Sequence, residues 1–203
     1  LLSITALSVC FGITRQTRHL MNQPLGYEHD GIIFVQFLDR GMNRHYDELK
    51  SQAYVSETGL YTNRPDGPSA TMVQKYDGQT ATLEFIEGDR KYFEILGIRF
   101  LENFSAADGM ENIYLCQSTY DATAGFRDGN MIPAWNGMAP ICGTINDLKL
   151  GSLTKETAGR LMGITMINDY DNSFGLGGQI CIKTEENVNE VCRRIKEFYH
   201  SKG

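Results

Sequence analysis

The chain has 203 residues, of which 41% are hydrophobic and 10% aromatic, so it can bury a core and is not a disordered chain. It carries 19 basic and 25 acidic side chains, a net charge of −6, and no basic run exceeds two residues, as in Arg193-Arg194. Proteins that bind DNA or RNA normally carry a basic excess, so we expect no nucleic-acid partner.

The opening segment of residues 1–13, LLSITALSVCFGI, carries no charge and is followed by Arg15, Arg18 and His19. It is too short to span a bilayer, which needs about 20 residues. A signal peptide has its basic residues before the apolar stretch, whereas here they follow it. We therefore predict the final turns of a membrane helix that continues to about residue 22 and ends before Pro24. An ordinary buried helix at the start of a soluble domain is the alternative.

The next part of the chain alternates between strand and helix patterns. Residues 31–38 form a near-continuous apolar run of strand length, which predicts a central strand. Residues 42–53 place Met, Tyr, Leu and Ala at the spacing of one helix face, and residues 55–61 predict a second strand. Together these segments predict a β-α-β unit.

The middle of the chain predicts, in order, strands at residues 71–76 and 80–86 around an Asp77-Gly78 turn, a helix at 90–96, a strand at 112–117, a helix at 118–124, a loop at 127–140 and a strand at 141–145. We expect Asp89 to cap the first helix, Gly97 to end it, and Ser118 to cap the second.

The end of the chain predicts a strand at 161–167, a turn at 169–173, a strand at 178–183 and a helix from Thr184 onward, whose apolar stripe comprises Val188, Val191, Cys192, Ile195, Phe198 and Tyr199. The fold class is therefore α+β with two subdomains. Both chain ends, residues 25–65 and 160–203, form a part with β-α-β and β-β-α pieces. Residues 66–159 form an inserted strand-rich part, and residues 1–24 form the membrane helix end and its extension.

The sequence offers no recognisable catalytic constellation. The histidines at 19, 29, 45 and 200 lack the spacing of metal ligands, and neither G-x-S-x-G nor a phosphate-binding loop is present. The glycine-rich residues 174–178 precede a strand, which does not fit a dinucleotide motif. Asp169, Asp171 and Asn172 lack the central glycine and final glutamate of a calcium loop. We therefore expect no catalytic, cofactor-binding or metal-binding residues, and no enzyme.

Two sets of side chains leave alternatives open. The five cysteines, at positions 10, 116, 142, 181 and 192, are best explained as small buried hydrophobes, although a disulfide between Cys142 and Cys181 stays open. Five aromatic side chains could line a ligand cleft between the subdomains or pack in the core: Tyr92, Phe93, Phe100, Phe104 and Trp135.

Two motifs carry a resemblance to a known family. Residues 88–101, GDRKYFEILGIRFL, are followed by Asn103-Phe104-Ser105 and Asp108, and residues 143–153 read GTINDLKLGSL. They resemble the D-x-x-Y-F-x-x-L-G-I-x-x-L…N-F-S…D and G-V-V-x-D-F-x-x-x-S-L segments of the MacB-like periplasmic core domain of MacB/FtsX-type ABC transporter permeases. The apolar opening followed by Leu25-Gly26-Tyr27 resembles the passage from the first membrane helix into that domain, notably in Bacteroidetes-like versions.

The resemblance implies a position and a set of partners. The domain is expected on the periplasmic side of the bacterial cytoplasmic (inner) membrane, between the first and second membrane helices, with a porter-like α/β part and an inserted part. It is expected to relay motion driven by a cytoplasmic ABC ATPase, to pair with a second permease copy or paralogue, and to meet a periplasmic adaptor. The alternative is a membrane-tethered extracytoplasmic ligand-binding or sensor domain.

Overall fold

The computed structural model describes residues 25–36, 45–67, 70–76, 79–104, 111–126, 128–134, 137–149, 161–167 and 179–202. The predicted membrane helix, the turn at 169–173, the glycine-rich residues 174–178, and Cys10, His19 and Trp135 lie outside these residues. No helix in the described ranges is both long and apolar enough to cross a bilayer.

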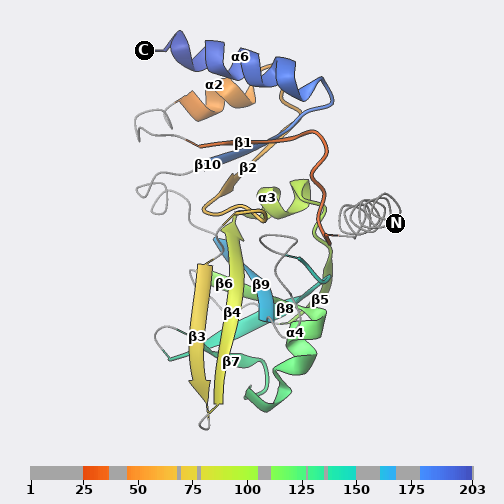
Figure 1. The fold of residues 1–203 in the computed structure, drawn as a ribbon, viewed down its shortest axis with the longest axis vertical. Coiled ribbons are helices and arrows are strands. Elements are labelled where there is room, and N and C mark those ends of the chain that lie inside the picture. Colours follow the sequence, from red (N-terminus) through yellow and green to blue (C-terminus); the bar gives the residue numbers. More distant parts are fainter. Residues whose placement is uncertain are drawn as a thin grey trace, which may run out of the picture.

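Ten strands in the described part of the chain belong to one mixed sheet, whose main path runs β1-β10-β2-β4-β9-β6-β8-β5, while β3 pairs with β4 and β7 with β8 (Figure 1). Their bounds are β1 Ile32–Val35, β2 Glu57–Tyr61, β3 Ala70–Tyr76, β4 Gln79–Gly88, β5 Phe100–Asn103, β6 Glu111–Cys116, β7 Met131–Ala134, β8 Gly137–Ile145, β9 Leu161–Ile167 and β10 Gln179–Lys183. The helical elements are α2 Tyr46–Lys50, α3 Arg90–Ile95, α4 Gln117–Ala122, the 3₁₀ turn Ala124–Phe126 and α6 Val188–His200.

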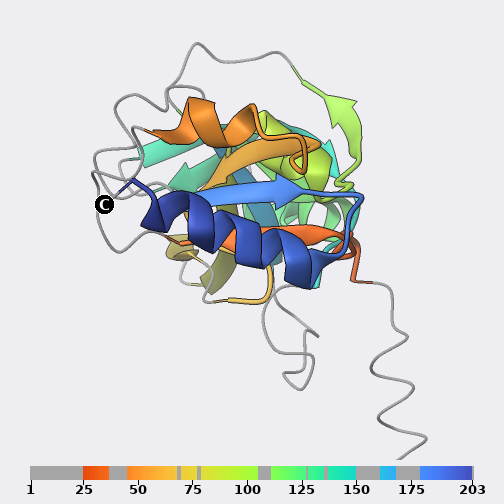
Figure 2. The same ribbon diagram turned by 90° about the horizontal axis from the view of Figure 1, so that it is seen from above.

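One end of the sheet is a three-stranded unit, β1-β10-β2, that α2 and α6 cover on one face (Figures 1 and 2). We call these five elements the terminal block. Both β1 and β2 run antiparallel to β10, so they are parallel to each other and form a β-α-β unit with β10 inserted between its strands. Most of the predicted stripe of α6 faces this sheet, since Val191, Ile195 and Tyr199 are buried in one cluster with Leu49 of α2. Val188, at the start of the helix, is exposed instead.

The rest of the sheet, β4-β9-β6-β8-β5 with β3, β7 and α4, forms what we call the central block. β4 pairs with β9 in parallel, and β3 pairs with β4 as the predicted hairpin, with Tyr76 opposite Gln79. A separate buried cluster fills this block and contains Leu83, Phe85, Ile113, Leu115, Ile132 and Ile141. The two blocks therefore have hydrophobic clusters of their own in addition to one that they share.

The predicted loop at residues 127–140 is wrong, because the structure forms the antiparallel hairpin β7–β8 there. Two prolines and several glycine and asparagine residues suggested a loop. Pro133 is tolerated because β7 pairs with β8 on one side within the described residues, so the missing N–H need not serve a second neighbour. Ile132 is buried and anchors the hairpin to the core of the central block.

The α+β class is confirmed. The division at residues 65–66 and 159–160 stays a prediction. Within the described residues, β9 pairs with β4 and β6 of the central block and not with the strands of the terminal block.

Candidate functional site

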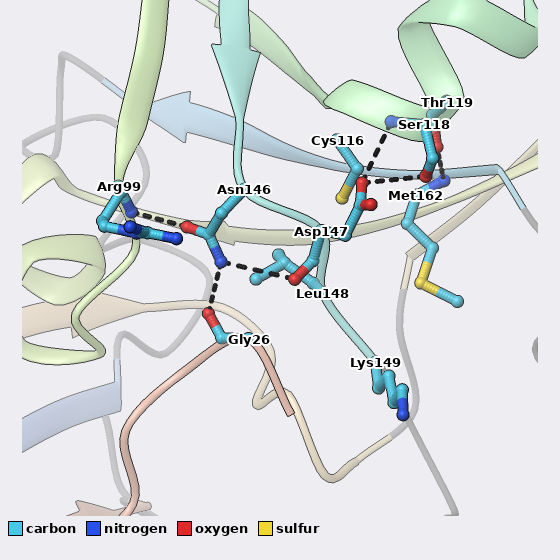
Figure 3. A pocket seen from close by; sticks show the side chains of 10 residues that line it. All are labelled: Gly26, Arg99, Cys116, Ser118, Thr119, Asn146, Asp147, Leu148, Lys149 and Met162. Atoms are coloured by element: carbon cyan, nitrogen blue, oxygen red, sulfur yellow. Dashed lines mark hydrogen bonds between the residues drawn. The ribbon is translucent and has the colours of Figure 1, made fainter. Parts of the chain in front are cut away.

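Five segments that are distant in sequence line one open cleft of about 450 Å³, and three of them are joined through Asn146 (Figure 3). Gly26 comes from the start of the described chain, Arg99 follows α3, and residues 146–149 follow β8. These are the same regions that carry the family resemblance. The full lining comprises Gly26, Arg99, Cys116, Ser118, Thr119, Asn146, Asp147, Leu148, Lys149 and Met162. We call the contacts among Leu25, Gly26, Arg99, Asn146, Asp147 and Lys149 the entry junction.

Asn146 is the centre of the entry junction. Its side-chain oxygen accepts the backbone N–H of Arg99 at 2.7 Å, and its side-chain nitrogen donates to the carbonyl of Gly26 at 2.6 Å. The Asn146 backbone N–H also donates to the Arg99 carbonyl at 3.0 Å. Figure 3 shows the amide lying between Arg99 and Gly26. One side chain therefore joins positions that are 47 and 120 residues away from it along the chain.

Gly26 allows the chain to approach this closely. Its φ is +82°, in the left-handed region, and an added Cβ would lie 1.9 Å from the carbonyl oxygen of Asp147. Beside it, the backbone N–H of Lys149 donates to the carbonyl of Leu25 at 2.9 Å. The carbonyls of residues 25 and 26 are thus both held by the segment that follows β8.

Asp147 connects the same segment to α4. Its carboxylate accepts the backbone N–H of Ser118 at 3.0 Å and the Ser118 hydroxyl at 2.8 Å. The prediction that Ser118 caps this helix is therefore wrong: Cys116 is the N-cap residue and makes no side-chain cap bond. A carboxylate 29 residues further along supplies the acceptor instead.

Residues 25–31, which we call the entry segment, continue from this junction to the terminal block. The Glu28 amide donates to the carbonyl of Leu96 at 2.7 Å. The Lys183 ammonium lies 3.3 Å from the Glu28 carboxylate and donates to the carbonyl of Asp30 at 2.9 Å. The Thr184 amide donates to the carbonyl of Gly31 at 2.9 Å. The entry segment is therefore bonded at one end to the central block and at the other to the terminal block.

The two blocks themselves meet between β2 and β4, and within the described residues these strands share the single register pair Tyr61↔Gly88. Helix α3 lies below β2 (Figure 1) and reinforces the contact, because Tyr61 stacks on Tyr92 with ring centroids 5.3 Å apart. Gly59 and Gly88 leave room for Tyr92, since an added Cβ would lie 2.3 Å from its amide nitrogen or 2.2 Å from its ring. We call these contacts the joint.

Asp89 begins α3 at this joint, as predicted, and its carboxylate accepts the Tyr92 amide at 2.6 Å. Burial raises the pKa of the Asp89 carboxyl, and the Tyr92 hydrogen bond opposes that rise. The folded protein therefore keeps this proton to a higher pH than the unfolded chain does. The stabilisation from Asp89 is fully present below its unfolded pKa and is lost as the pH rises through its folded pKa.

We expect Asp89→Asn to be at least as stable as the wild type at pH 7, because asparagine keeps the cap and carries no buried charge. Asp89→Ala removes the cap and should lower the free energy of unfolding by about 1 kcal/mol. Urea unfolding between about pH 4 and pH 8 measures both, and the asparagine variant should lose the pH dependence that this carboxyl contributes. An asparagine variant as unstable as the alanine variant at pH 7 would contradict this assignment.

The aromatic side chains considered for a ligand cleft are instead divided among hydrophobic clusters. Tyr92 and Phe93 are fully buried at the joint. Phe100 packs against the cluster that the two blocks share, whereas Phe104 packs against the cluster of the central block. The described members of the set therefore do not form a common cleft.

The cysteines in the described ranges are free, so the disulfide between Cys142 and Cys181 that the sequence left open is wrong. Cys116, Cys142 and Cys181 are buried, as expected for small hydrophobes, and Cys192 is partly exposed. Burial raises the pKa of the Cys116 and Cys181 thiols to about 12. Both are therefore protonated and poorly nucleophilic at neutral pH.

The absence of a metal site stays a prediction, which was based on histidine spacing and on the lack of a calcium loop. In the described structure His29 and His200 are exposed, and His45 lies 3.4 Å from Glu48. Within the same residues, the structure contains no group of three or more His, Cys, Asp or Glu side chains that could hold a metal ion. Sequence reasoning also missed Asn146 as the centre of the junction, although an Asn-Asp pair directly after a strand was visible in the second motif.

The comparisons with known proteins concern the fold. No protein-family model matches the chain, and no curated protein is significantly similar to it in sequence. Among solved structures, the periplasmic region of MacB from Actinobacillus actinomycetemcomitans matches with a TM-score of 0.54 at 13% identity, covering 90% of this chain and 88% of that one. The extracellular domain of the noncanonical ABC-type transporter YknZ from Gram-positive bacteria matches with a TM-score of 0.51 at 10% identity, covering 80% and 87%. This chain therefore has the fold of the MacB-like periplasmic domain.

Proposed function

We propose that this chain is the extracytoplasmic domain of an ABC transporter permease subunit in the bacterial cytoplasmic membrane. In this role it relays ATPase-driven motion of the membrane helices to a substrate or partner outside. The observation that carries the proposal is the entry junction, where the first described residues are fixed to the body of the domain by Asn146 and Lys149. The fold shared with the MacB and YknZ domains supports the setting.

A relay needs a stiff connection, so that a displacement at one end moves the other end as well. The carbonyls of Leu25 and Gly26 are each held by a short hydrogen bond to residues 146–149. Asn146 is itself tied to the backbone of Arg99 through both its amide and its side chain. A displacement of the chain preceding residue 25 therefore acts directly on the central block, and the expected response is a rigid-body rotation rather than local unravelling.

The proposed partners follow from this role. They are a cytoplasmic ABC ATPase, reached through the membrane part, a second permease copy or paralogue, and a periplasmic adaptor. The domain itself acts as a binding and force-transmitting module and not as an enzyme. We favour this role over the membrane-tethered sensor, because Tyr92 and Phe93, which were considered for a ligand cleft, lie in the core.

Site-directed cysteine labelling of the full-length protein tests the proposed extracytoplasmic location. Ala122 at the end of α4 is exposed, and Cys10 and Cys192 can be replaced by serine, leaving the three buried cysteines in place. In this background, Ala122→Cys should react with a membrane-impermeant maleimide in intact cells whose outer membrane has been permeabilised. The buried thiols should stay unmodified because they are shielded from the reagent and, for Cys116 and Cys181, protonated.

The serine-substituted parent without Ala122→Cys serves as the control and should remain unlabelled. Labelling that requires cell lysis would contradict an extracytoplasmic position. Labelling from outside without co-purification of any ATPase would favour the sensor alternative, whereas labelling together with an ATPase supports the permease.

A further inference from the structure

The sheet has a weak point between its two blocks. β10 pairs with β1 over four residue pairs and with β2 over five, and β4 pairs with β9 over six. Between β2 and β4, the described residues supply one register pair, flanked by hydrogen bonds from Thr62 to Glu87 at 2.9 Å and from Asp89 to Leu60 at 2.8 Å. Sheet pairing alone therefore couples the blocks far less strongly than it couples the strands inside each block.

Three features act across this weak point. The side chain of Asn63, which follows β2, accepts the backbone N–H of Glu87 in β4 at 2.6 Å. Helix α3 contacts the terminal block from below, with Tyr92 stacked on Tyr61. The entry segment provides a second connection that does not pass through the β2–β4 pair. It is bonded to the central block at residues 25 and 26 and to the terminal block at residues 28, 30 and 31.

We propose that the entry segment is a conformational coupling element that makes the two blocks of the sheet move as one body. A pull on the chain before residue 25 loads the central block through Asn146 and, through the same seven residues, the terminal block through Lys183 and Thr184. With the far end released, the pull acts on the central block alone, and the blocks rotate relative to each other about Tyr61 and Gly88. The direction of pull rests on the proposed function, whereas the coupling is a property of the domain itself.

A substitution at Gly31 can detach the entry segment from the terminal block with little other change. Its φ is +68°, and an added Cβ would lie 2.5 Å from the carbonyl oxygen of Thr184. Gly31→Ala therefore forces the entry segment away from β10. Gly129→Ala is a matched control, because Gly129 has a φ of +59° but nothing lies within 4 Å of an added Cβ. Both variants carry the strain of a left-handed alanine, and only the first meets a backbone atom.

Lys183→Met gives a second, milder release by removing the bonds to Glu28 and Asp30. Lys202→Met is its control, because Lys202 pairs with Glu48 inside the terminal block. This pair of variants keeps the proposal testable if Gly31→Ala fails to fold.

The test is a distance distribution from pulsed electron paramagnetic resonance on the purified full-length protein, without nucleotide. Spin labels are attached through genetically encoded ketone side chains at exposed Lys196 on α6 and exposed Ala122 on α4, and labelled copies are diluted with unlabelled ones. We expect a single narrow distribution for the wild type and both controls. Gly31→Ala should broaden it at least about twofold, with a smaller broadening for Lys183→Met.

An unchanged narrow distribution in both release variants would overturn the proposal, because the core at the joint would then suffice to hold the blocks. A broad distribution in the wild type would overturn it as well. Neither result depends on an ATPase, so this test can fail while the proposed transport function stands.

Discussion

Gly59→Ala is expected to lower the free energy of unfolding by about 3 kcal/mol, at the upper end of the usual cost of overpacking a core. The added methyl would lie 2.3 Å from the amide nitrogen and 2.5 Å from the Cα of Tyr92. These are backbone atoms of α3, so they cannot move aside as the end of a flexible side chain can. The methyl must separate α3 from β2 and disturb the stack of Tyr61 on Tyr92.

Gly125→Ala provides the matched control for this change, since nothing lies within 4 Å of a Cβ added at that position. Its free energy of unfolding should stay within about 0.5 kcal/mol of the wild type. Urea denaturation followed by circular dichroism compares the two variants. Equal stability of the two would mean that α3 does not pack on β2 as described.

Asn146→Ala is expected to detach the start of the entry segment from the central block. The substitution removes the acceptor for the Arg99 amide and the donor to the Gly26 carbonyl. At about 1 kcal/mol net for each lost hydrogen bond, the local cost is about 2 kcal/mol. Because each 1.4 kcal/mol corresponds to a factor of ten, the Arg99 amide should exchange its hydrogen more than about tenfold faster.

Asn130→Ala is the control for the same chemical change, since the side-chain oxygen of Asn130 accepts an exposed hydrogen bond from the Tyr120 hydroxyl at 2.8 Å. Its effect on Arg99 exchange should be negligible. Asn146→Asp separates the two hydrogen bonds, because it keeps an acceptor for the Arg99 amide but loses the donor to the Gly26 carbonyl. The Arg99 amide should therefore exchange its hydrogen more slowly in Asn146→Asp than in Asn146→Ala. If the Arg99 amide exchanges its hydrogen equally fast in Asn146→Ala and in the wild type, Asn146 does not hold the entry junction together.

Features set by neighbouring residues were predictable from the sequence. Asp89 caps α3, and Gly97 follows this helix with a φ of +64°, because capping and chain reversal depend on a few adjacent positions. The apolar stripe of α6 was predictable for the same reason, since helical spacing alone determines which side chains share a face. The pairing of β3 with β4 followed from the Asp77-Gly78 pair in the sequence between them.

The junction was not predictable in the same way, because its contacts depend on tertiary structure. Asp147 bonds to the first turn of α4 from 29 residues away, and nothing near Ser118 in sequence indicates this. Asn146 reaches Gly26 across 120 residues. Sequence reasoning could place an asparagine after a strand and a glycine after a helix, but not bring them together.

The hairpin of β7 and β8 was missed for a different reason. Proline and glycine between two strands normally indicate a loop, and Pro133 lies opposite Met138 in this hairpin. Whether a proline is tolerated depends on whether its strand must also pair on the other side, which is a property of the sheet. The pattern around residue 133 therefore could not decide the question alone.

The proposed relay through Asn146 is tested most directly by the response of the domain to nucleotide in the full-length protein with its proposed ATPase partner, reconstituted in lipid nanodiscs. A single spin label at Lys196 reports the distance between the two copies of the proposed dimer, with and without ATP and vanadate. The account predicts that vanadate trapping shifts this distance in the wild type, and that Asn146→Ala loses most of the shift while still hydrolysing ATP. An equal shift in both proteins, or no shift in an active wild type, would contradict it.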